Sequence, residues 1–94
     1  MGRRSETIVL FVEKENAPYV LTKPLHHSQK LLECRDDGII ISIKVIPNFE
    51  LEKEILSFGD RMIVISPERI KRHLATRMGK ALDLMVNFKN DFES

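Results

Sequence analysis

Four segments of the chain have the character of strands. Residues 7–12 are β-branched and aromatic, which favours a strand, and residues 39–46 and 61–65 are also rich in Ile and Val. Residues 29–35 form a more polar segment, which carries Lys30, Glu33 and Arg35 as an edge strand does. The third segment is the most apolar, and its alternate side chains point to two opposite faces. One face carries Ile39, Ile41, Ile43 and Val45, and the other carries Ile40, Ser42, Lys44 and Ile46. The pattern therefore predicts four strands, of which the first, third and fourth are apolar on both faces.

Two stretches between these strands carry helix signals. Asn16 offers an N-cap to a first helix, which we expect to end before Pro24 because the residue preceding a proline disfavours helical geometry. Asn48 offers a cap to a second helix, whose early glutamates suit the positive end of the helix dipole. Gly59 follows this helix, where a glycine commonly terminates helical geometry.

A third, longer helix is predicted near the end of the chain. Ser66 is expected to cap it, with Pro67 in its first position. Its apolar stripe is formed by Ile70, Leu74, Met78, Ala81, Met85 and Phe88, at spacings of three and four. We expect residues 89–94 to form a frayed polar tail and residues 1–6 to be disordered or derived from cloning. The segment 7–88 is then a single domain.

The order of these elements predicts the fold. The sequence Asp36-Asp37-Gly38 lies between two strands and predicts a hairpin, because glycine tolerates the positive φ of tight turns. The resulting order is typical of an α+β, ferredoxin-like βαββαβ antiparallel sheet with strand order 4-1-3-2, here followed by an extra C-terminal helix. Two crossover helices cover only one face of such a sheet. The second face must be covered by the final helix, a neighbouring domain or another copy of the chain.

Composition narrows the class of protein. Fifteen Lys and Arg residues against fourteen Asp and Glu residues give a net charge of +1, without the surplus that phosphate binding requires. Cys34 is the only cysteine, which excludes an internal disulfide and fits a reducing cytoplasm. The longest apolar runs, residues 8–12 and 39–43, are far shorter than the roughly 20 residues of a membrane span. We therefore expect a cytoplasmic protein without a membrane partner.

Four short signatures carry a resemblance to a known family. They are Pro24-Leu25-His26-His27-Ser28-Gln29, Phe49-Glu50-Leu51, Leu56-Ser57-Phe58-Gly59-Asp60 and Val64-Ile65-Ser66-Pro67-Glu68. In this order and spacing the chain resembles, over about residues 7–86, the C-terminal extension of bacterial WYL-domain transcriptional regulators, called the WCX domain.

The resemblance implies a regulatory role. Such regulators combine a helix-turn-helix domain, a WYL domain and this extension, which contributes to dimer assembly and to the effector-binding surface. The implied partners are thus the WYL and helix-turn-helix domains of the same parent chain and a second copy of the chain. Promoter DNA would be contacted only through the helix-turn-helix domain, which this chain lacks. The effector is not identified; nucleic acid and a small anion are the candidates.

The densest polar cluster lies between the first helix and the second strand. His26, Ser28 and Gln29 match the family pattern, whereas His27 varies, and the three are candidates for contact with a ligand or with the WYL domain. The structural alternative gives Ser28 and Gln29 the task of capping backbone groups and His26 a packed, hydrogen-bonded position. A shared metal ion is not expected, since adjacent side chains on a strand point to opposite faces.

A basic stripe on the last helix is the second candidate. Arg69, Arg72, His73 and Lys80 fall on one side of the helix and could bind an anion or nucleic acid. The alternative is a solvated charged face.

Two competing functions belong to other classes. A free-standing, ferredoxin-like domain would bind a small molecule in a groove between two copies. An enzyme would need ionisable groups that converge in a cleft, and no such pair stands at a recognisable spacing. Cys34 is interpreted as a small buried hydrophobic residue. We therefore expect neither catalysis nor a cofactor.

Overall fold

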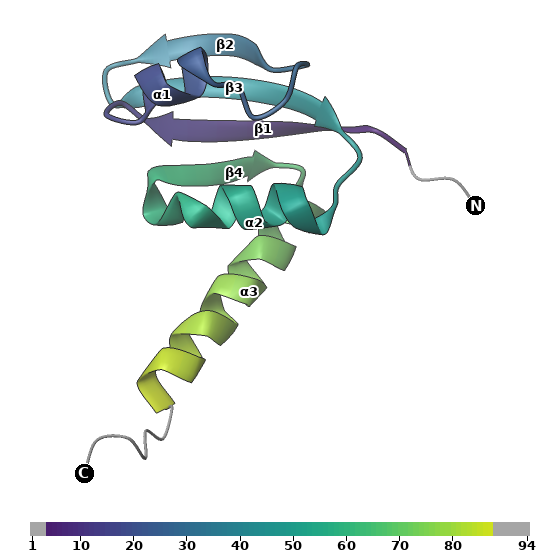
Figure 1. The fold of residues 1–94 in the computed structure, drawn as a ribbon, viewed down its shortest axis with the longest axis vertical. Helices are drawn as coiled ribbons and strands as arrows, with labels where there is room; N and C mark the ends of the chain where they lie inside the picture. Colours follow the sequence, from purple (N-terminus) through teal and green to yellow (C-terminus); the bar gives the residue numbers. More distant parts are fainter. Residues whose placement is uncertain (1–3, 88–94) are drawn as a thin grey trace.

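A computed structural model describes residues 4–87 and confirms the predicted α+β fold. Its elements are β1 (Glu6–Glu13), α1 (Ala17–Thr22), β2 (Lys30–Arg35), β3 (Gly38–Val45), α2 (Phe49–Ser57), the 3-10 turn η1 (Gly59–Arg61), β4 (Met62–Ser66) and α3 (Glu68–Asn87). The four strands form one antiparallel sheet in the order β2-β3-β1-β4, which is the predicted order read from the opposite edge (Figure 1). The predicted tail, residues 89–94, and Phe88 of the predicted stripe lie outside the described residues, as do residues 1–3.

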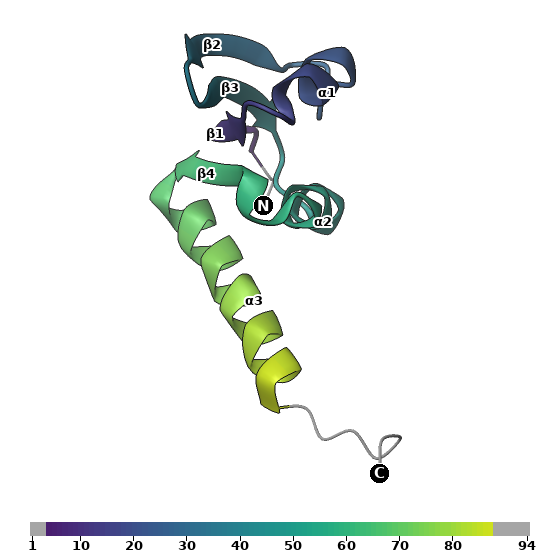
Figure 2. The same ribbon diagram turned by 90° about the vertical axis from the view of Figure 1, so that its left-hand side faces the viewer.

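The core lies between one face of the sheet and the two crossover helices. The buried apolar side chains of the sheet alternate along each strand, as the strand period requires: Ile8, Leu10 and Val12 on β1, Ile39, Ile41, Ile43 and Val45 on β3, and Met62 and Val64 on β4. Helix α1 adds Ala17 and Val20, and α2 adds Leu51 and Ile55. Both helices lie on the same side of the sheet (Figure 2). The central positions of β1 and β3 therefore follow from their apolar sequences.

The hairpin between β2 and β3 forms where it was predicted, but Gly38 has a different role. Arg35 pairs with Gly38, so the turn consists of Asp36 and Asp37, and only Gly59 has a positive φ (63°) among the described residues. A Cβ atom at position 38 would lie 2.1 Å from the carbonyl oxygen of Val12 and 2.8 Å from the ring of Phe11. The glycine is required by close packing against β1, and the expectation of a positive φ there was wrong.

The predicted helix caps are borne out in one case out of three. The side chain of Asn48 accepts a hydrogen bond from the backbone N–H of Leu51 at 2.9 Å. Asn16 precedes α1 but has helical backbone angles, and its side chain makes no capping bond. Ser66 still belongs to β4, where it pairs with Val9, so α3 begins one residue later than the predicted Ser66-Pro67 start. Because Ser66 pairs with β1, it is part of the sheet and not of the start of α3.

Helix α3 extends away from the sheet (Figures 1 and 2). Only Ile70 and Leu74 of its 20 residues are buried. The Cα radius of gyration is 15.4 Å, against about 12 Å for a compact chain of this length. On the face of the sheet that α1 and α2 leave bare, Ile63 and Ile65 remain 50% and 41% exposed. The final helix therefore does not cover that face.

Candidate functional site

The polar cluster between α1 and β2 is held by backbone groups. The Ser28 hydroxyl accepts a hydrogen bond from the Lys44 N–H at 2.8 Å and donates one to the Lys44 carbonyl at 3.1 Å. Its oxygen also lies 2.8 Å from Nδ1 of His26. The loop is thereby fastened to β3, at a point where β2 has not yet begun to pair.

Gln29 fastens the other end of the same loop. Its Oε1 accepts a hydrogen bond from the Leu25 N–H at 2.9 Å, and its Nε2 donates one to the Val20 carbonyl at 3.1 Å. The second bond satisfies a carbonyl near the end of α1, which has no further helical turn to do so. These contacts agree with the structural alternative for Ser28 and Gln29. Their contact with a ligand or with another domain stays a prediction.

His26 is the member of this cluster that faces a cleft. The cleft has a volume of about 520 Å³ and lies between this loop and α2, with Glu50, Lys53 and Glu54 also on its wall. His26 and His27 lie in a turn, not on a strand, and their ring centroids are 4.0 Å apart. The argument that a strand separates the two rings was therefore wrong. Within residues 4–87, no group of three potential metal ligands is present.

The predicted basic stripe is largely paired with carboxylates of the same chain. Arg69 bonds to Glu6, Arg72 lies 3.3 Å from Glu68, and His73 lies 3.1 Å from Glu52. Lys80 is exposed, about two turns further along the helix. These pairings reduce the positive potential available to an anion at the start of α3.

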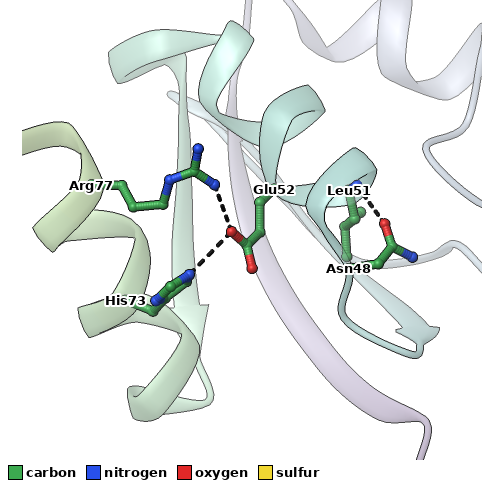
Figure 3. Close-up of polar contacts among 5 residues, drawn as sticks. All are labelled: Asn48, Leu51, Glu52, His73 and Arg77. Atoms are coloured by element: carbon green, nitrogen blue, oxygen red, sulfur yellow. Dashed lines mark hydrogen bonds and ion pairs between the residues drawn. The ribbon is translucent and has the colours of Figure 1, made fainter. Parts of the chain in front are cut away.

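Arg77 is a site residue that the sequence reasoning missed. Its Nη1 lies 2.7 Å from Oε1 of Glu52, the oxygen that also accepts the contact with His73 (Figure 3). The guanidinium of Arg77 lies 5.3 Å from the centre of the Phe49 ring. We call Glu52, His73 and Arg77 the Glu52 clamp. It joins the first turn of α2 to the second and third turns of α3. The spacing of four residues between His73 and Arg77 is the sequence signal that could have included Arg77 in the stripe.

Cys34 is exposed, contrary to the interpretation of it as a buried residue. It lies on β2, whose six residues are all exposed because this strand forms an edge of the sheet. Lys30, Glu33 and Arg35 accompany it, as is typical of an edge that is protected from pairing with other chains.

Apolar surface is left uncovered around β4 and α3. A groove of about 300 Å³, which we call the β4 groove, lies between α2, β4 and α3; its apolar lining includes Leu56, Met62, Ile63, Ala75 and Met78. Met78, on the wall of the groove, is 43% exposed, and Leu82 and Met85 further along α3 are 61% and 80% exposed. Single exposed apolar residues are ordinary, whereas large apolar patches on soluble proteins are often sites of interaction.

Comparison with known proteins identifies the family of the chain. No curated protein matches the chain in a sequence search. No helix within residues 4–87 is long and apolar enough to cross a membrane. The model of the WCX domain matches residues 4–82, which include all four strands, and WCX domains are C-terminal domains associated with WYL regulators. The chain therefore belongs to the WCX domain family.

Proposed function

We propose that the chain is the regulatory C-terminal domain of a WYL-type bacterial transcriptional regulator in the cytoplasm, and that it acts by docking and assembly and not by catalysis. Membership of the WCX family supports a parent protein that contains a WYL domain. In this proposal, promoter DNA is bound by a separate helix-turn-helix domain. The WCX domain adjusts that binding through its contacts with the WYL domain or with a second copy.

The apolar surface that remains outside a complete core carries the proposal. Nine sheet residues and two helices already close one face, with Ile8, Leu10, Ile41 and Ile43 fully shielded. That core does not include Ile63, Ile65 or the end of α3. Burying an apolar side chain of this size is worth about 1.5–3 kcal/mol relative to leaving it exposed. Docking onto another surface would recover that free energy for several side chains at once.

The contacts of the polar side chains favour a role in assembly over a role in catalysis. The Ser28 hydroxyl, which lies 2.8 Å from Nδ1 of His26, is already bonded to both backbone groups of Lys44. Nucleophilic catalysis needs a hydroxyl or thiol that is free to reach a substrate. The basic side chains Arg69, Arg72 and His73 likewise have carboxylate partners. The proposal therefore places assembly ahead of anion sensing.

Deletion of the domain from its parent regulator tests the proposal. Promoter affinity would be measured by fluorescence anisotropy, and the association state by sedimentation velocity, for the whole regulator and for a variant truncated before residue 4. We expect the truncation to change the promoter Kd several-fold or to shift the association state. A truncated regulator that binds its promoter, assembles and responds like the whole protein would refute a regulatory role.

A further inference from the structure

We infer that α3 is a hinged arm, whose direction is set by ionic contacts at its base and changes when those contacts are broken. The inference does not depend on the proposed function, because it concerns only how the helix is held. Three features lead to it: a short apolar contact, unfilled space on both sides of that contact, and a row of basic side chains that joins α3 to two other elements.

The apolar contact between α3 and the rest of the domain is about one helical turn long. Its buried residues, Ile70 and Leu74, lie four positions apart, which corresponds to about 6 Å of helix. From Leu74 to Asn87 the helix continues away from the sheet for about 20 Å without a further buried side chain (Figure 2). A contact of one turn acts as a pivot, and a rotation of about 15° there moves the far end of the helix by about 5 Å.

Unfilled space lies on both sides of this pivot. A crevice of about 240 Å³ lies between α3, β1 and α2, and its apolar wall includes Ile8, Leu51 and Ile55. The β4 groove, of about 300 Å³, lies on the other side of Leu74, which borders both spaces. Closely packed helices resist rotation because the side chains of one fill the grooves of the other. The base of α3 lacks this interlocking, so its apolar contact does not by itself define the direction of the helix.

A row of basic side chains supplies the missing restraint, and we call it the α3 ladder. Arg69, His73 and Arg77 follow one another at intervals of four residues and therefore lie along one side of the helix. Arg69 bonds to Glu6 of β1, whereas His73 and Arg77 lie 3.1 Å and 2.7 Å from the same carboxylate oxygen of Glu52 on α2 (Figure 3). The ladder is about 12 Å long and reaches about one turn beyond the apolar contact. Its two anchor points on different elements fix a direction that a single apolar turn leaves open.

The ladder responds to ions because its members are partly exposed. The side chains of Arg69, His73 and Arg77 are 69%, 55% and 34% exposed. The range of electrostatic interactions falls from about 10 Å at 0.1 M salt to about 3 Å at 1 M, so salt weakens these pairs, whereas the apolar core has no charge to be screened. Glu52 accepts two of the three contacts. Salt, or an anion that competes with Glu52 for His73 and Arg77, would therefore redirect α3 without unfolding the domain.

Distances between two spin labels, measured by double electron–electron resonance, test the hinge. One label is placed on native Cys34, which is exposed at the β2 edge, and the other on Val86→Cys, a position that is 71% exposed near the end of α3. At low salt we expect a narrow distance distribution. Glu52→Gln, which keeps the size of the side chain and removes its charge, should broaden the distribution at least about twofold, and 1 M NaCl should do the same to the chain with native Glu52. An excess of unlabelled chain keeps the measured distances within one molecule.

Glu50→Gln is the matched control. Glu50 also lies in the first turn of α2, is exposed and makes no ion pair within residues 4–87, so its substitution should leave the distribution unchanged. A distribution that stays narrow in Glu52→Gln or in 1 M NaCl would overturn the hinge, as would equal broadening by the two substitutions. A low-salt distribution that is already as broad with native Glu52 as with Glu52→Gln would overturn it too. These distances leave the deletion experiment unaffected, so the hinge and the regulatory function can fail separately.

Discussion

Replacement of Glu52 by alanine tests whether the Glu52 clamp fixes α3 to the body of the domain. One carboxylate oxygen of Glu52 receives both His73 Nε2 at 3.1 Å and Arg77 Nη1 at 2.7 Å (Figure 3). The Glu52 side chain is only 19% exposed, and that of Arg77 is 34% exposed. The substitution therefore removes two polar contacts and leaves a partly buried guanidinium with only the Phe49 ring beside it.

The expected loss of stability follows from the exposure of each partner. The side chain of His73 is 55% exposed, so its hydrogen bond to Glu52 contributes only about a few tenths of a kcal/mol. The contact with Arg77 is better shielded and belongs with hydrogen bonds to charged groups, at about 1.5 kcal/mol. Loss of a negative charge from the first turn of α2 adds about 0.3–0.5 kcal/mol. We expect Glu52→Ala to lower the free energy of unfolding by about 2 kcal/mol.

Glu50→Ala is the matched control for this change. Glu50 also lies in the first turn of α2, is exposed, and makes no ion pair within residues 4–87. It should lose only the helix-dipole contribution, about 0.3–0.5 kcal/mol. Urea denaturation followed by far-UV circular dichroism would measure both variants. Equal losses for the two variants would refute the clamp, as would a double-mutant cycle of Glu52→Gln with Arg77→Met that shows no coupling.

Three further substitutions test local features of the fold by thermal or urea denaturation. Gly38→Ala should cost at least about 2 kcal/mol, because its Cβ would meet the backbone oxygen of Val12 at 2.1 Å; a neutral result would contradict the close strand packing. Asn48→Ala should cost about 1 kcal/mol and Asn16→Ala only a few tenths, since only the former side chain caps its helix; the reverse order would contradict the assignment. Ser28→Ala should cost about 1–3 kcal/mol through its bonds to the β3 backbone, and Ser28→Thr should retain much of that stability; equal losses would exclude the hydroxyl as the cause.

Features that depend on neighbouring residues in the sequence were predicted well. The Asn48 cap involves a residue three positions away, and the termination at Gly59 depends on one φ angle. The strands lie within one residue of their predicted limits. Each strand buries apolar side chains, so the apolar residues in the sequence indicate where it begins and ends. The strand order followed from the sequence of elements and from the apolar character of the two central strands.

Features that depend on contacts across the fold were not predicted. The role of Gly38 is set by Val12 on another strand, and the role of Arg77 by Glu52 on another helix. Cys34 was interpreted as a buried strand residue, but the sheet edge leaves it exposed. A sequence pattern shows which side of a helix or strand is apolar, but it does not show where the element ends relative to the sheet. For the same reason, the apolar stripe of α3 did not predict that residues 76–87 would extend past the sheet without a buried side chain.

The Glu52 clamp is physically connected to the exposed apolar residues at the end of α3. A helix that buries only Ile70 and Leu74 has few apolar contacts to hold its direction. The Glu52 clamp and the Glu6–Arg69 pair hold α3 from two other elements, α2 and β1. Residues 76–87 of α3 form about 18 Å of helix without a buried side chain. A small rotation at the base of α3 therefore displaces Met85 by several ångströms. The polar contacts at the base of α3 therefore position the exposed apolar residues at its tip.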